Sequence, residues 1–177
     1  MDGQHGRPEN RRMPFRRTLL LSLAALLAAP GWAQPRTPFA TPERDEASLY
    51  IAQRNFVVTR IGNECLALVG RSESPKAFNE AWRQRNAVFV DASAKYLDQR
   101  LDDIVATGGQ EMRQAALREL QARVSTPGEA SVRALLQGRK EDACMREVTK
   151  VEAGAYDISS GLPKYEQLEA LVRWAAQ

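Results

Sequence analysis

The sequence predicts an all-α protein, a bundle of four to five helices cross-linked by one disulfide. Apolar residues recur at steps of three, four and seven along most of the chain, which is the spacing of one helix face. Proline and glycine stand where helices are expected to begin and end. The two β-prone clusters, Phe56-Val57-Val58 and Val88-Phe89-Val90, each lie inside a longer helical pattern.

The first two helices are predicted from their capping residues. Thr41 is suited to cap a helix that begins at Pro42 and continues to about Val69. Ser74 and Pro75 open a second helix in the same way, and we expect it to end at the glycine pair 108–109. The apolar face of this second helix consists of Phe78, Trp82, Phe89, Ala92, Tyr96, Leu101 and Val105.

Further helices are predicted after the glycine pair. Thr107 stands three residues before Gln110, which is the spacing of a capping box for a third helix. The segment Thr126-Pro127-Gly128-Glu129 is a second capping box and predicts that a fourth helix begins there. We expect this fourth segment to bend or restart at Gly138. A linker over residues 159–163 precedes the last helix, which carries Tyr165, Leu168, Leu171, Val172 and Ala175.

Residues 1–33 have the pattern of a secretory signal peptide. Paired arginines at positions 11–12 and 16–17 precede an uncharged apolar run over residues 18–29, and small residues flank Trp32. The run is shorter than the ~20 residues that span a bilayer, so we expect cleavage after Ala33 and no membrane span in the mature chain. The protein is therefore expected in the periplasm or outside the cell. Met13 is an alternative start, and Arg16-Arg17 leaves the twin-arginine route open.

Charge is balanced once the expected leader is removed. The leader holds five of the 25 basic residues and two of the 22 acidic ones, so residues 34–177 carry 20 of each. A nucleic-acid-binding domain has a basic surface, and nucleic acid is therefore not an expected partner. Residues 34–41 are predicted to be a flexible lead-in, and residues 42–177 to be a single helical domain.

The chain has two cysteines, Cys65 and Cys144, and both lie on predicted apolar faces. Because export places them in an oxidising compartment, we predict an internal disulfide. A free reactive thiol and an intermolecular bridge are the alternatives. There is no CxxC or CxxCH motif, so neither a redox pair nor a covalently attached haem is predicted.

The residue types of the expected mature chain exclude several kinds of catalysis. The only histidine, His5, lies in the leader, which excludes histidine-based acid–base catalysis and histidine-ligated metals. Asp91, Asp98 and Asp102 share one helix face, where a hard cation would find carboxylate ligands. A solvated face with ion pairs through Lys95 is the favoured interpretation. No catalytic residue, cofactor or metal is predicted.

The most unusual local cluster is the segment from Trp82 to Asn86. Tryptophan and arginine are enriched at protein interfaces, so Trp82, Arg83 and Arg85 are candidates for contact with a partner. The position of Trp82 on the apolar face favours the core instead. Trp174 lies off the apolar face of the last helix and is a further candidate for partner contact.

The favoured function is a non-enzymatic exported protein that binds another protein, as an inhibitor, an immunity protein, a chaperone or an accessory subunit. One alternative is a bundle that binds a small ligand in a pocket lined by Met112, Met145 and aromatic residues. The other is a carboxylate-dependent enzyme of the cell envelope. For the latter, Glu73-Ser74 is a weak motif, because the adjacent Pro75 indicates a helix cap. No motif identifies a family.

Overall fold

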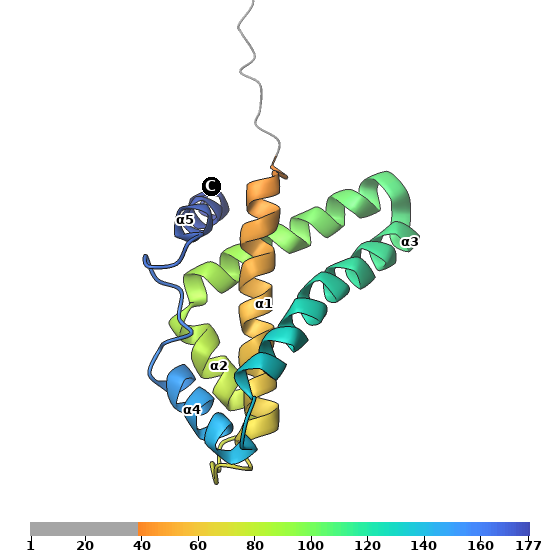
Figure 1. The fold of residues 1–177 in the computed structure, drawn as a ribbon. Helices are drawn as coiled ribbons and strands as arrows, with labels where there is room; N and C mark the ends of the chain where they lie inside the picture. Colours follow the sequence, from red (N-terminus) through yellow and green to blue (C-terminus); the bar gives the residue numbers. More distant parts are fainter. Residues whose placement is uncertain (1–38) are drawn as a thin grey trace, which may run out of the picture. The chain divides into compact units, whose positions relative to one another are not determined.

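The computed structural model describes residues 39–177, which form five α-helices. These are α1 (Pro42–Cys65), α2 (Pro75–Arg85), α3 (Ala87–Leu135), α4 (Lys140–Glu152) and α5 (Tyr165–Ala175). The central helix, α1, contacts each of the other four (Figure 1). The predicted all-α fold is confirmed. The predicted signal peptide and most of the lead-in lie outside the described residues.

The predicted caps of α1 and α2 are confirmed. The Thr41 hydroxyl accepts a hydrogen bond from the Arg44 amide at 3.3 Å, and the Ser74 hydroxyl accepts one from the Ala77 amide at 3.1 Å. Each hydroxyl satisfies an amide that has no partner within its own helix. Glu73 therefore lies in the exposed loop before α2.

The core forms where the other helices pack on α1. From α1 it takes Ala47, Ile51, Val57, Val58, Ile61 and Cys65, and the largest fully buried side chains of the other helices are Trp82, Tyr96, Leu168 and Leu171. Ser48 of α1 and Ser93 of α3 form a buried hydroxyl pair at 2.8 Å, which satisfies both groups where the two helices cross. None of the helices within residues 39–177 is both long and apolar enough to cross a membrane.

The predicted disulfide is present. Cys65 at the end of α1 and Cys144 in α4 are bonded, with their Cα atoms 5.0 Å apart and both side chains buried. The bond fixes α4 beside the last turn of α1. The chain between the two cysteines contains all of α2 and α3, so the disulfide closes a loop around most of the domain.

The predicted second helix is interrupted at Asn86, where the structure has a junction between α2 and α3. Asn86 is buried, and its amide nitrogen donates to the carbonyl of Trp82 at 2.8 Å. Its side-chain oxygen accepts from the backbone amide of Ile158 at 2.7 Å. Asparagine competes with the backbone for hydrogen bonds in this way, and the bond to a distant loop stabilises the break.

The predicted helix start at Thr126 is wrong, because α3 continues through Pro127 to Leu135. Proline has no amide hydrogen, so the carbonyl of Arg123 loses its usual partner in the helix. The side chain of Gln53 on α1 donates to this carbonyl at 3.0 Å. A neighbouring helix thus replaces the bond that the proline removes.

Replacing Pro127 by alanine tests this compensation. Gln53→Ala is expected to lower the free energy of unfolding by about 0.5–1 kcal/mol in the natural background, since its hydrogen bond is exposed. In a Pro127→Ala background, the backbone amide of residue 127 can donate to the carbonyl of Arg123. Gln53→Ala is then expected to have little effect on the free energy of unfolding. Urea unfolding of the four proteins of this double-mutant cycle gives the coupling. Equal effects of Gln53→Ala in both backgrounds would contradict the compensation.

The predicted capping box at Thr107 is also wrong. The Thr107 hydroxyl donates backwards to the carbonyl of Asp103 at 2.9 Å, and α3 reverses direction at Gly109. Gly109 has φ 74° and ψ −173°, a conformation that is strained for any residue with a Cβ atom. The two halves of α3 therefore form a helical hairpin (Figure 1), and Gly109 is the non-helical residue between them.

Candidate functional site

The predicted partner-binding cluster contacts the chain itself. Trp82 is fully buried and donates from its indole nitrogen to the carbonyl of Tyr156 at 3.1 Å. Arg85 donates to the carbonyl of Val151 at 2.7 Å and forms an ion pair with Asp157 at 2.9 Å. Trp82 offers no surface to a partner, because its position on the apolar face of α2 turns it into the core.

Arg83 and Trp174, the other two candidates, are partly buried, and Arg85 is exposed. Arg83 lies 3.7 Å from Glu80 on the surface of α2. Trp174 is half-buried, with its ring 5.4 Å from that of Tyr96 and 6.4 Å from that of Phe39. Partner contact at Arg83, at Arg85 and at the open part of Trp174 stays a prediction.

A buried carboxylate, Glu147 of α4, is a polar centre that the sequence did not reveal. Only 1% of its surface is exposed, yet it accepts from the hydroxyl of Tyr156 at 2.7 Å and pairs with Arg146 and Lys150 at 2.7 and 3.0 Å. Burial raises the pKa of Glu147, but the hydrogen bonds from Tyr156, Arg146 and Lys150 outweigh it and lower the pKa. Burial and the bond to Glu147 raise the pKa of Tyr156.

The lowered pKa makes Glu147 a source of acid sensitivity. A carboxylate whose folded-state pKa lies below its ordinary value, 4.5, stabilises the fold fully above that pH. The stabilisation is lost as the pH falls through the folded-state pKa. Glu147→Gln is expected to lower the free energy of unfolding by about 2 kcal/mol at neutral pH. The difference from the natural protein is expected to shrink below pH 4.5.

Urea unfolding at a series of pH values measures this difference. Glu166→Gln provides the control, because Glu166 lies exposed on α5. It is expected to have little effect at any pH. A stability difference for Glu147→Gln that stays constant from neutral pH to acid would show that the charge on Glu147 does not stabilise the fold.

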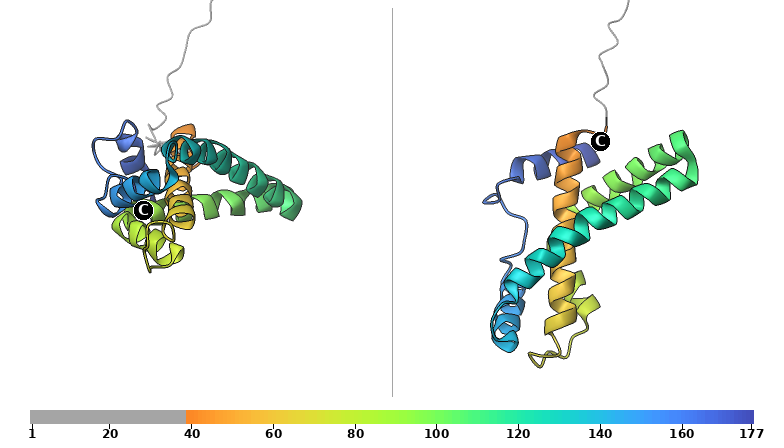
Figure 2. Two further views of the ribbon diagram at one scale, coloured as in Figure 1. Left: turned by 60° about the horizontal axis from the view of Figure 1, so that its bottom comes forward. Right: turned by 45° about the vertical axis from the view of Figure 1, so that its right-hand side comes forward.

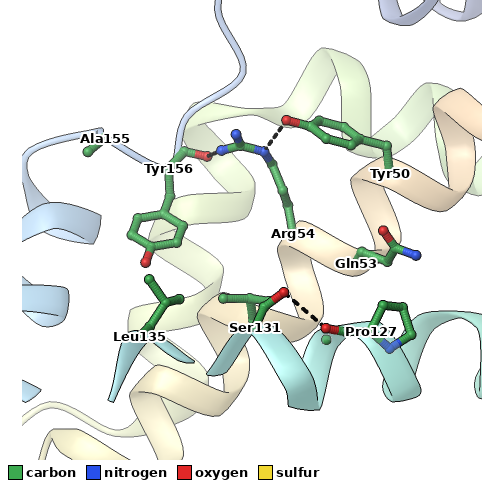
Figure 3. A pocket seen from close by; sticks show the side chains of 10 residues that line it. Tyr50, Gln53, Arg54, Pro127, Ser131, Leu135, Ala155 and Tyr156 are labelled. Atoms are coloured by element: carbon green, nitrogen blue, oxygen red, sulfur yellow. Dashed lines mark hydrogen bonds between the residues drawn. The ribbon is translucent and has the colours of Figure 1, made fainter. Parts of the chain in front are cut away.

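A pocket of about 300 Å³ lies between α1, the second half of α3 and the loop after α4 (Figure 3). α1 contributes Tyr50, Gln53, Arg54 and Val57, which share one face of the helix. The other two segments contribute Pro127, Gly128, Ser131, Leu135, Ala155 and Tyr156. Gly128 permits the close approach of the helices, since a Cβ atom there would lie 2.4 Å from the ring of Phe56.

Arg54 is held in place beside this pocket. Its Nε donates to the hydroxyl of Tyr50 at 2.8 Å, and its Nη1 donates to the carbonyl of Tyr156 at 2.8 Å (Figure 3). The guanidinium also lies 5.1 Å from the centre of the Tyr50 ring. The part of the chain that the structure describes places no carboxylate within 4.0 Å of Arg54, so its charge is not neutralised by an ion pair.

The α3 hairpin, which we define as residues 97–124, is a second candidate site. Its turn lies on the side of α1 away from α4 and α5 in all three views (Figures 1 and 2). No residue from 102 to 121 is buried. This distal segment nevertheless carries five large apolar side chains, which are Ile104, Val105, Met112, Leu117 and Leu120.

A second pocket lies at the base of the α3 hairpin. A cavity of about 160 Å³ lies between its arms, lined on one arm by Leu97, Leu101 and Ile104 and on the other by Ala116 and Leu120. Met112 and Leu117 stand further out, with 56% and 36% of their surfaces exposed. The charged residues Asp45, Arg100, Glu119 and Arg123 also line this cavity, which is open to solvent.

The acidic residues do not gather into a metal site in residues 39–177. Asp91, Asp98 and Asp102 are exposed on α3. Lys95, which was expected to pair with them, donates to the carbonyl of Ala175 at 2.6 Å. Hydrogen bonding to Lys164 lowers the pKa of Glu46, the opposite direction to that required of a general acid.

Comparison of the chain with protein-family models, with curated proteins and with solved structures gives no match. The fold and the sites define the protein only as an all-α domain of five helices with one disulfide, a ligand-sized pocket and a protruding helical hairpin.

Proposed function

We propose that the protein acts by binding another protein through the α3 hairpin. The observation that carries the proposal is the distal segment, residues 102–121, which has five large apolar side chains and no buried residue. Ordering a backbone opposes folding by about 1–2 kcal/mol per residue, and burial of apolar surface is the main compensation. A partner that covers these side chains would supply the burial that the hairpin lacks.

The chemistry of the distal segment defines the partner it fits. The apolar side chains favour a partner with an apolar surface, such as one face of an amphipathic helix. Asp102 and Asp103 flank them on the first arm, whereas the second arm carries Glu111 and Glu119 beside Arg113 and Arg118. The partner is thus expected to carry basic groups beside the first arm. We place this function in the periplasm or outside the cell, in agreement with the disulfide.

Site-specific photo-crosslinking in the producing cell tests the proposal. A photoreactive amino acid replaces Met112 or Leu117 in the α3 hairpin. Met145 on α4 and Leu68 after α1 are matched controls, because they are exposed to a similar degree, at 48% and 46%. The hairpin positions are expected to give a discrete protein adduct that the control positions do not give. Equal adducts from all four positions, or none from the hairpin, would contradict the proposal.

A second candidate function is the binding of a small ligand. Met112 and Met145, which were expected to line a pocket, are exposed and lie outside the pocket of Figure 3. The observation in favour of this function is Arg54, a cation without an ion pair in the described chain, at a pocket of about 300 Å³. That volume is at the lower end of the range for small-molecule sites, about 300–1,000 Å³.

A further inference from the structure

We propose that the pocket beside Arg54 binds the carboxylate of a small organic anion whose remaining part is apolar. The proposal makes the second candidate function specific, and it does not depend on the α3 hairpin. It rests on how Arg54 is positioned, on the absence of an ion pair for it in residues 39–177, and on the mixture of polar and apolar groups around it.

Arg54 is held in place by two hydrogen bonds, which leave some of its N–H groups without a partner in the described chain. A guanidinium has five N–H groups, and the two hydrogen bonds to Tyr50 and Tyr156 use one on Nε and one on Nη1. Within the described chain, Nη2 forms no hydrogen bond to another residue. A planar carboxylate matches two neighbouring N–H groups of arginine, and such charge-assisted bonds are about twice as strong as neutral ones.

The two groups that hold Arg54 also favour binding of an anion. The Tyr50 hydroxyl accepts its bond from Arg54 with an oxygen lone pair, so its own hydrogen stays available for a ligand oxygen. The Tyr156 carbonyl also accepts from Trp82 of the core at 3.1 Å, which fixes the loop that holds Arg54. The cation is therefore preorganised, and binding requires little further ordering of its side chain.

The rest of the lining indicates what the carboxylate is attached to. Val57, Pro127 and Leu135 present apolar side chains to the pocket, and Gly128 presents none. Ser131 already donates its hydroxyl hydrogen to the carbonyl of Pro127 at 2.9 Å. An apolar or aromatic body fits the walls formed by Val57, Pro127 and Leu135, whose side chains offer no hydrogen bond to a sugar or a second charged group.

The test is an NMR titration of the mature protein with benzoate, benzamide and inorganic phosphate. Benzamide has the shape of benzoate without its charge, and phosphate has charge without an apolar body. Benzoate is expected to bind saturably, and the two other compounds at least about tenfold more weakly. The amide signals that move are expected to belong to residues of the pocket, such as Gly128 and Tyr156.

Three variants identify the groups responsible. Arg54→Gln is expected to weaken benzoate binding by about tenfold or more. Because Arg54 also holds the loop at Tyr156, Ser131→Phe provides a second variant that fills the pocket without removing the arginine. It is expected to abolish benzoate binding. Arg60→Gln is the matched control, since Arg60 lies on the same helix but pairs with Glu64 and Glu129. It is expected to leave binding unchanged.

The possible outcomes test the charge of the ligand, its apolar body and the role of Arg54 separately. Benzamide binding as tight as benzoate binding would overturn the anion assignment and leave a neutral small-ligand pocket. Phosphate binding as tight as benzoate binding would overturn the inference that the ligand has an apolar body. Unchanged benzoate affinity in Arg54→Gln would overturn the role of that residue. No saturation by benzoate at about 10 mM would overturn this inference, while the proposal for the α3 hairpin would stand.

Discussion

Replacing both Cys65 and Cys144 by alanine is expected to lower the free energy of unfolding by about 4.5 kcal/mol. The two residues are 79 positions apart, so their bond restricts a long loop in the unfolded chain. Unfolding free energies of single domains are about 5–15 kcal/mol, and the disulfide thus supplies a large part of the stability. Urea unfolding of the double variant against the oxidised natural protein measures the effect.

Reduction of the natural protein separates the cross-link from the packing of the two side chains. The reduced protein keeps both buried sulfur atoms, so it is expected to lose nearly as much stability as the double alanine variant. A loss below about 1 kcal/mol on reduction would contradict the structural role given to the disulfide. A free thiol in the oxidised protein, found by labelling after unfolding, would contradict the bond itself.

Trp82→Ala is expected to lower the free energy of unfolding by about 3–5 kcal/mol. Trp82 is the largest fully buried side chain, and its removal leaves a cavity between α1, α2 and the loop after α4. Its loss also removes the indole hydrogen bond to the carbonyl of Tyr156. Thermal and urea unfolding measure the change.

Two neighbouring substitutions serve as comparisons for Trp82→Ala. Trp82→Phe keeps a buried ring but loses the donor, so its effect is expected to be smaller. Arg83→Ala is expected to change the free energy of unfolding by no more than about 0.5 kcal/mol, because Arg83 lies on the surface of α2. If Trp82→Ala were as mild as Arg83→Ala, Trp82 would not be part of the core.

Sequence reasoning succeeded where the structure depends on nearby residues. The caps at Thr41 and Ser74 and the end of a helix before Gly138 follow from short-range rules. It failed where a distant segment decides the outcome. The break at Asn86 depends on Ile158, which lies 72 residues away, and the helix through Pro127 depends on Gln53. Local patterns carry no information on such partners.

The same limit applies to the candidate sites. The cluster at Trp82 to Arg85 has the composition of an interface, but Trp82 and Arg85 hold the loop at Tyr156 and Asp157. Arg54 was missed as a candidate. The spacing of Tyr50, Arg54 and Val57 places them on one helix face, yet nothing in the sequence shows that α3 and the loop after α4 close a pocket over it. The exposure of the α3 hairpin likewise depends on the packing of the whole domain.

The central claim is that the α3 hairpin binds a protein partner. Native mass spectrometry of the protein recovered gently from the producing cells tests it most directly. The natural protein is expected to carry the mass of a second polypeptide, and a variant with Met112→Glu and Leu117→Glu is expected to lack it. A control with Leu68→Glu and Met145→Glu changes equally exposed side chains elsewhere and is expected to retain the complex. A bare monomer in the natural protein, or a complex retained by the hairpin variant, would contradict the claim.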